Sequence, residues 1–371
     1  MNNYHTPGGG PPPGPNSYKK GLGFIRNSIQ RAIHDPIFEM VKIMPKFSRI
    51  VAPQTRKIPE NATIPLINLD HLSELKGEAR KQLVKQYGDG LRQEGFVGIH
   101  AQQLNHLIEQ VYREMKEYYH QTFDQKILDW QGYLGMQGYF HQGLEFAPNA
   151  KQADIKESYY VPLGHDRWPA RTSPSFARTI SDYQSYMFEY TKSLMKVLYE
   201  YLGRSHAEVD QSLSPRDSLL RLTHYPTLKP TDHAEALWAA PHKDSNALTI
   251  MPPGSIPGLE VLTPQGNWKP IIVPHGYIIV SIGMQTEHKT AGLIKARVHR
   301  VINPGGRLTL AERYSTSFYG HYFPDHSLKP FDQCLEVVTH EMPPNRKASF
   351  LKQYPDIPAK EINKELYDTF R

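Results

Sequence analysis

Seven short runs rich in β-branched and aromatic residues, separated by turns containing proline or glycine, do most to restrict the fold. Between residues 218 and 323 they read SLLRLTHY, NALTIM, GLEVL, WKPIIV, GYIIVSI, ARVHRVI and RYSTSFYGHYF. Strands of this length at this spacing are typical of an antiparallel sandwich or barrel. We therefore expect a β core over residues 216–335.

Three stretches of helical spacing precede these runs. Each places apolar residues three or four positions apart, which predicts one buried stripe on a helix. The stripes consist of Leu72, Leu75, Ala79, Leu83, Tyr87 and Leu91; of Leu104, Leu107, Ile108, Val111 and Met115; and of Phe176, Ile180, Tyr183, Met187, Tyr190, Leu194, Leu198 and Leu202. Asp70 is a suitable N-cap for the first helix. The chain is thus predicted to be α+β, with a helical part over residues 61–215 and a C-terminal segment over 336–371.

The first 60 residues differ in composition from the rest. Residues 1–17 are rich in glycine and proline, which predicts a disordered tail, and residues 18–60 read as a basic helical extension. The stretch MNNYHTPGGGPPPGPN lacks the basic region followed by an apolar core that a secretory signal has. We expect residues 61–371 to form a single domain.

Charge and cysteine usage restrict the partners and the compartment. The net charge is +6, but the basic residues form no dense patch interleaved with aromatic residues, so we expect no nucleic-acid partner. The longest apolar run, PIIVPHGYIIVSIG, is interrupted by proline, histidine and glycine and predicts buried strands, not a transmembrane segment. The single cysteine, Cys334, fits a reducing compartment, and we expect a cytoplasmic protein.

The stretch APHKDSNALTI, residues 240–250, places an imidazole and a carboxylate at the entrance to a predicted strand. His242 and Asp244 are two residues apart, so on extended backbone they lie on the same face. A third ligand, His299, lies in another predicted strand, ARVHRVI. Two histidines and one carboxylate are the facial triad of non-heme Fe(II) enzymes, which leaves three coordination positions open.

The spacing of His242 and Asp244 is not unique in the chain. His206 with Glu208 and His233 with Glu235 repeat it. The first pair follows a predicted helix and the second follows a proline-rich loop, whereas His242 and Asp244 lead directly into a strand. Context therefore favours His242 and Asp244.

A second constellation follows in ERYSTSF, where Arg313 and Ser315 lie on one face of a predicted strand. A buried guanidinium beside a hydroxyl is suited to bind a carboxylate. Next to an open iron site, that carboxylate could belong to a keto-acid cosubstrate. Arg307 is a rival by spacing, and a structural ion pair is the alternative for Arg313 taken alone.

From about residue 63 to 355 the chain resembles the isopenicillin N synthase-like 2-oxoglutarate/Fe(II) dioxygenases. The matching motifs follow one another in family order: IPLINLD, EGFVGIH, GYFHQGLEFAPNAKQADIKESYYV, DRWP, LRLTHYP, PHKDSNALTIM, PGLEVLTPQGNWKPIIVPHGYIIVSIG, ARVHRVINP and RYSTSFY. The resemblance implies a double-stranded β-helix, or jelly roll, with helices packed outside.

The same resemblance implies roles for individual residues. His242, Asp244 and His299 would bind Fe(II), and Arg313 and Ser315 would hold the distal carboxylate of 2-oxoglutarate with Tyr225 as a third contact. Molecular oxygen would be the other cosubstrate, and a small molecule would be oxidised as succinate and CO2 are released. Apart from the resemblance, the loops of residues 131–160 and the strand after Ser315 are expected to form pocket walls, which makes Tyr159 and Phe318 candidate substrate contacts, with a core position as the alternative.

Departures from the family pattern leave alternatives open. Thr223 stands where members usually have asparagine, and Met284 replaces an aspartate that is not a metal ligand. The carboxylate anchor also fits an Fe(II) oxidase that binds its own substrate there and uses no 2-oxoglutarate. A catalytically inactive binding protein on the same fold is the third reading. The prime substrate, the reaction outcome (hydroxylation, desaturation or cyclisation) and the oligomeric state cannot be read from the sequence.

Overall fold

The computed structural model describes residues 62–132, 136–145, 153–227, 237–303 and 310–368. Contacts divide the chain into two units, Met1–Ser48 and Arg49–Arg371, and all described residues belong to the second unit. The predicted tail and basic extension lie outside the described residues, so their boundaries stay predictions.

Two β-sheets form the centre of the described unit. The first has eight strands in the order β1 (Leu66–Ile67), β2 (Phe96–His100), β10 (Tyr277–Ile282), β7 (Leu248–Met251), β12 (Arg313–Tyr322), β5 (Leu213–Tyr225), β4 (Glu157–Pro162) and β3 (Gly138–Phe140). The second has four strands in the order β6 (Ala239–His242), β11 (His299–Val301), β8 (Leu259–Leu262) and β9 (Trp268–Pro270). All paired strands are antiparallel except β1 and β2, which confirms the predicted antiparallel architecture.

A shared apolar core joins the two sheets. One cluster of buried side chains combines Met251 and Ile279 of the large sheet with Val261 and Val301 of the small sheet. Trp238, fully buried just before β6, belongs to the same cluster. Burial of apolar surface on both inner faces therefore holds the sheets together as a sandwich.

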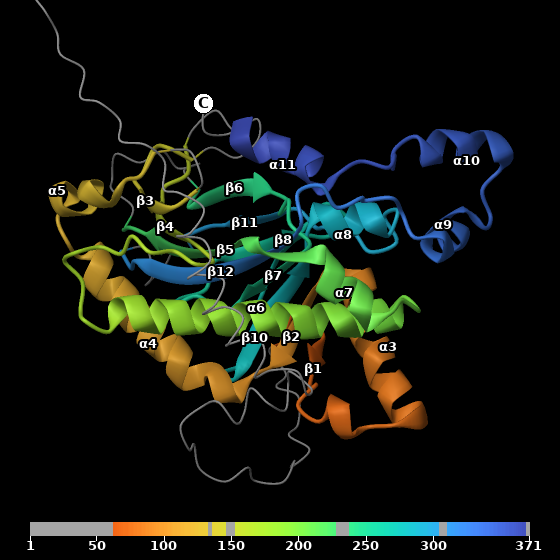
Figure 1. Cartoon of the computed structure of the whole chain (residues 1–371), viewed down its shortest axis with the longest axis horizontal. Helices are drawn as coiled ribbons and strands as arrows, with labels where there is room; N and C mark the ends of the chain where they lie inside the picture. Colours follow the sequence, from red (N-terminus) through yellow and green to blue (C-terminus); the bar gives the residue numbers. More distant parts are fainter. Residues whose placement is uncertain (1–61, 133–135, 146–152, 228–236, 304–309, 369–371) are drawn as a thin grey trace, which may run out of the picture. The chain divides into compact units, whose positions relative to one another are not determined.

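Helices cover the other face of the large sheet. The three predicted stripes correspond to α3 (Gly77–Glu94), α4 (Asn105–Tyr119) and α6 (Phe176–Tyr201). The long α6 crosses the large sheet and packs on β5, β7 and β12 (Figure 1). The short helices are η1 (Leu72–Glu74), η2 (Gln102–Leu104), α5 (Phe123–Lys126), η3 (Ile127–Asp129), α7 (His206–Ser212), α8 (Met284–Lys289), α9 (Asp332–Thr339), α10 (Pro344–Leu351) and α11 (Ala359–Asp368).

The start of the first helix differs from the prediction. The stripe that begins at Leu72 is divided between η1 and α3, because Leu75 and Lys76 are extended and Gly77 has a φ of 59°. Lys76, not Asp70, occupies the N-cap position of α3. The Asp70 carboxylate instead lies 2.6 Å from the His100 ring at the end of β2. Among helices of the described segments, none is both long and apolar enough to cross a membrane.

Candidate metal centre

The structure brings His242, Asp244 and His299 together at one end of the small sheet. His242 is the last residue of β6 and faces His299, the first residue of β11, across an antiparallel pair. Asp244 lies in the connection from β6 to β7 and not on a strand. One ligand atom from each of the three residues lies within 4.8 Å of the other two.

Backbone carbonyls orient both imidazole rings. The Nδ1 atom of His242 lies 2.8 Å from the Ala240 carbonyl, and Nδ1 of His299 lies 3.1 Å from the Arg297 carbonyl. Because a carbonyl only accepts hydrogen bonds, each Nδ1 carries the hydrogen and each Nε2 keeps a free lone pair. These Nε2 atoms lie 3.8 and 3.6 Å from Oδ1 of Asp244.

A hydrogen bond fixes the Asp244 carboxylate. The Thr249 hydroxyl donates to Oδ2 at 2.6 Å, so Oδ1 remains free to face the two histidines. Burial alone would raise the pKa of Asp244, but the two histidines and the Thr249 hydrogen bond lower it below its usual range. Burial and the neighbouring His299 lower the pKa of His242 to about 4. The group therefore presents a carboxylate and a neutral imidazole near neutral pH.

This donor set fits a divalent transition metal. Ligands at right angles around such an ion lie about 3 Å apart, because each bond is about 2.1 Å long. The observed separations of 3.6 and 3.8 Å are slightly wider, and all three donors lie within 4.8 Å of one another. Two imidazoles and one carboxylate suit Fe(II).

The rival histidine pairs differ in placement. His206 is the first residue of α7, where Ser205 and Glu208 form a capping box, and its ring contacts Glu200 on the surface. This pair therefore stabilises a helix start. His233 and Glu235, like Arg307, lie outside the described residues.

Arg313 and Ser315 are both buried at the start of β12. The Nε of Arg313 donates to the Ile256 carbonyl at 3.1 Å, and its guanidinium lies 5.0 Å from the centre of the Tyr225 ring. Its buried Nη1 has no hydrogen-bond partner within the described part of the chain. Gly254 leaves the space beside the guanidinium, because a Cβ there would overlap Nη2. A guanidinium with an unused donor is ready for an anion.

Strand register shows which face of the large sheet carries the site. Arg313 pairs with Tyr225, Ser315 with Thr223 and Ser317 with Arg221, so the alternate residues of β5 and β12 share one face. This face includes the carboxylate anchor and is the inner face, because Tyr225 belongs to the core between the sheets.

Tyr159 and Phe318 lie on the opposite face. The Tyr159 ring packs edge-on against Tyr118 of α4, and the Phe318 ring packs against Phe188 of α6. Both side chains are fully buried between helices and sheet, so the expectation that they line a substrate pocket does not fit the structure. A one-residue offset on a strand is enough to turn a side chain to the other face. Their neighbours Tyr160 and Tyr319 face inward instead.

Sequence reasoning missed a buried ionic cluster beside the triad. Lys156 lies 2.6 Å from Asp154 and 2.7 Å from Glu145, and Tyr160 donates a hydrogen bond to Glu145. The other oxygen of Asp154 accepts the Ala240 amide at 2.8 Å. Asp154 therefore fixes the backbone of β6 two residues before His242. No local spacing signals this contact, which joins segments 86 residues apart.

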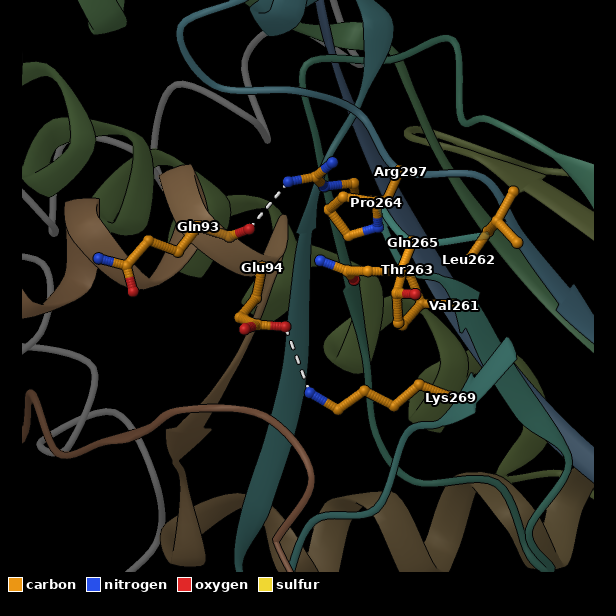
Figure 2. Close-up of a pocket in the computed structure, with 9 residues that line it drawn as sticks. All are labelled: Gln93, Glu94, Val261, Leu262, Thr263, Pro264, Gln265, Lys269 and Arg297. Carbon is orange, nitrogen blue, oxygen red and sulfur yellow. Dashed lines mark hydrogen bonds and ion pairs between the residues drawn. The ribbon is translucent and has the colours of Figure 1, made fainter. Parts of the chain in front are cut away.

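A separate hollow of about 310 Å³ lies between the end of α3 and the edge of the small sheet. Figure 2 shows the residues that line it. None of its lining residues belongs to the triad or to the Arg313 face. Its charged groups already have partners: Lys269 lies 3.3 Å from Glu94, and Arg297 donates to the Gln93 carbonyl at 2.8 Å. These contacts connect α3 to the small sheet. They account for the charged side chains of the hollow, so no bound ligand needs to be invoked there.

Comparison with known proteins identifies similar sequences. Residues 216–319 match the family described as the 2OG-Fe(II) oxygenase superfamily. The chain is 29% identical over 179 residues to the 2-oxoglutarate-Fe(II) type oxidoreductase hxnY of Emericella nidulans, covering 47% of this chain and 50% of that protein. It is 26% identical over 309 residues to jasmonate-induced oxygenase 3 of Arabidopsis thaliana, covering 79% and 80%. The chain spans about half the length, or less, of the first curated relatives it matches.

Solved structures of related proteins share the fold. A 2OG-Fe(II) oxygenase family protein from Caulobacter crescentus superposes with a TM-score of 0.70 at 22% identity, covering 84% of this chain and all of that one. A full-length Neurospora crassa protein solved in complex with alpha-KG gives a TM-score of 0.70 at 20% identity, covering 84% and 98%. The sandwich of this chain is accordingly the jelly roll of these proteins.

Proposed function

Because this chain belongs to the 2-oxoglutarate/Fe(II)-dependent dioxygenase family, we propose that it is an enzyme that oxidises a small organic molecule with 2-oxoglutarate and oxygen as cosubstrates. Succinate and CO2 are the coproducts. The observation that carries this proposal is the convergence of His242 with the buried Asp244 and His299 in the same sandwich as the buried Arg313. Among the described residues, the Arg313 guanidinium is incompletely paired.

Each side chain in the proposed site has a defined task. His242, Asp244 and His299 hold Fe(II), which supplies the redox chemistry with oxygen and the keto acid when it is bound. Arg313 and Ser315 bind the distal carboxylate of 2-oxoglutarate, and the Tyr225 ring supports the guanidinium from one side. Thr249 holds the carboxylate of Asp244 so that one oxygen points to the metal.

The finer assignment is to the isopenicillin N synthase-like branch, in a cytoplasmic setting. The branch rests on the order of the motifs and on the placement of Arg313 and Ser315 two residues apart on β12. The setting rests on the single buried thiol, Cys334, and on the need to keep iron in the Fe(II) state. Subcellular fractionation checks the compartment, and recovery with an oxidising compartment would contradict it.

The decisive experiment is an anaerobic titration of the metal-free protein with Fe(II) and then with 2-oxoglutarate. We expect one equivalent of iron to bind and a weak visible charge-transfer band to appear when the keto acid chelates it. Asp244→Ala removes one ligand and should abolish both signals. His206→Ala is the matched control and should keep both, because His206 lies at a helix start on the surface.

Three results of this titration would contradict the proposal. Iron binding without the band would indicate an oxidase whose own substrate occupies the anchor at Arg313. No iron binding would indicate an inactive binding protein. Retention of iron in Asp244→Ala together with its loss in His206→Ala would overturn the ligand assignment itself.

A further inference from the structure

A second arginine, Arg221, lies on the inner face of the large sheet. It pairs across the strands with Ser317 of β12 and Tyr160 of β4, on the same face as Arg313. Its guanidinium carbon lies 5.0 Å from the centre of the Tyr319 ring. Tyr319 pairs with Thr249 of β7, whose hydroxyl donates to Asp244, so the guanidinium lies on the part of the inner face next to the triad.

One donor of Arg221 is unused. Its Nε is buried without a hydrogen-bond partner in the described segments. Glu145, a carboxylate of the neighbouring ionic cluster, is bound by Lys156 and Tyr160. Asp154 is likewise occupied, by Lys156 and the Ala240 amide. A buried N–H group without a partner is unfavourable, so the arrangement suits an acceptor that arrives with a ligand.

Arg221 and Arg313 start from well-separated backbone positions on the inner face. Arg313 pairs with Tyr225, four residues further along β5 than Arg221, which corresponds to about 13 Å between backbone positions at about 3.3 Å per residue. Arg313 lies next to the core cluster that contains Tyr225, whereas Arg221 lies over Tyr319. The inner face therefore offers two separate cationic positions.

We infer that the prime substrate carries a carboxylate and that Arg221 binds it. This inference rests on the proposed function, in which Arg313 is occupied by the cosubstrate. The planar guanidinium presents parallel N–H donors that match a carboxylate, and the Tyr319 ring against one of its faces restricts its orientation. Lys156, Asp154 and Glu145 form the rigid polar wall beside this position.

The test observes the arginine directly and needs no knowledge of the whole substrate. Protein labelled with ¹⁵N-arginine is loaded with Zn(II) and saturating 2-oxoglutarate, and acetate is added as the smallest carboxylate probe. We expect the Nε–H signal of Arg221 to shift and saturate with acetate. Acetamide, or sodium chloride at the same ionic strength, should leave it in place. Arg221→Lys identifies the signal, and Arg216→Lys, an exposed arginine on β5, is the control that should keep it.

The outcomes separate this inference from the proposed function. An Nε–H response of Arg313 to 2-oxoglutarate with no response of Arg221 to acetate would overturn the inference and leave the dioxygenase proposal standing. No response of Arg313 to 2-oxoglutarate would count against the dioxygenase proposal. Equal shifts with acetate and acetamide would overturn carboxylate selectivity at Arg221. A larger shift of the Arg221 signal with inorganic phosphate than with acetate would also overturn carboxylate selectivity. Loss of the Arg221 Nε–H signal through exchange with water would show that this group is not buried and would overturn the inference.

Discussion

At the scale of single residues, the metal site depends on hydrogen bonds that leave one atom of each ligand free. Carbonyl oxygens accept hydrogen bonds from Nδ1 of His242 and His299. The Thr249 hydroxyl donates a hydrogen bond to one oxygen of Asp244. The remaining donors converge because their other polar atoms are already engaged. Groups that hydrogen-bond to metal ligands generally have a large effect on the affinity for the metal.

Thr249→Val tests this support. Valine has nearly the shape of threonine but cannot donate to Asp244, so the carboxylate loses its fixed orientation. We expect metal affinity to fall about 10- to 100-fold, with the fold retained. Competition titration with a metal-binding dye measures the change. Thr316→Val, at an equally buried position on the other face of β12, should leave the affinity unchanged. Equal losses in both variants would show a general effect of core polarity.

At the scale of elements, β12 links the anchor to the rest of the sandwich. Its first residue, Arg313, faces inward beside the connection that follows β7, where Gly254 lies against the guanidinium. Its far end carries His321, which is buried beyond an irregularity in the pairing of β12 with β5. Substitutions at the Arg313 end should change 2-oxoglutarate binding, and substitutions at the His321 end should change the pH dependence of stability.

Gly254→Ala tests the near end. The new Cβ would overlap Nη2 of Arg313, and the guanidinium, as the end of a flexible side chain, would move aside. We expect 2-oxoglutarate to bind more weakly, by about tenfold or more for a loss of about 1.4 kcal/mol. Iron binding should stay normal, since the three atoms nearest to the new Cβ all belong to Arg313 and none to the triad. Titration of the charge-transfer band gives both constants, and unchanged keto-acid binding would contradict the placement of the anchor.

His321 at the far end gives a dependence on pH. Burial lowers the pKa of His321 to about 4, whereas in an unfolded chain the value is about 6.5. As pH falls from about 6.5 to 4, the unfolded chain takes up a proton that the folded chain does not. The free energy of unfolding should therefore decrease by up to about 1.4 kcal/mol per pH unit from this group.

Urea unfolding of the metal-free protein at pH 7, 6 and 5 measures this slope. His321→Gln should make the slope shallower, because glutamine does not titrate. His340→Gln, at an exposed position after α9, serves as the control and should follow the wild-type protein. A wild-type slope in His321→Gln would show that other histidines, such as His242 with its similarly lowered pKa, carry the effect.

At the scale of the whole molecule, the proposed metal site draws on both sheets. Its three proposed ligands come from β6 and β11 of the small sheet and from the connection into β7 of the large sheet. A metal that binds only when these segments are in place stabilises the folded state by mass action. Ligand binding and global stability should therefore change together.

Removal of the metal tests this link. With free Fe(II) at a hundredfold excess over its dissociation constant, binding adds about 2.7 kcal/mol to the free energy of unfolding. A chelator should then lower Tm by about 3–5 °C, since about 1 kcal/mol corresponds to about 1–2 °C for a chain of this length. Calorimetry with and without chelator under anaerobic conditions measures it. Asp244→Ala should show no such difference, and a full chelator effect in that variant would place the metal elsewhere.

The sequence by itself determined the β-rich half, the three long helices and the residues of the candidate triad. Alternation of apolar residues and helical periodicity are local properties, so they predict β7, β10, β12 and α6 without knowledge of the fold. The order of motifs along the chain carried the family resemblance in the same way.

Only the tertiary structure decided which side chains share a face and which polar groups of the described segments lack a partner. Tyr159 and Phe318 read as pocket residues in sequence but lie against helices, because strand register and not proximity in sequence sets the face. Asp70 read as a helix cap but pairs with a histidine 30 residues away. The unused Nε of Arg221 and the bond from Asp154 to β6 arise from long-range packing, which no local pattern encodes.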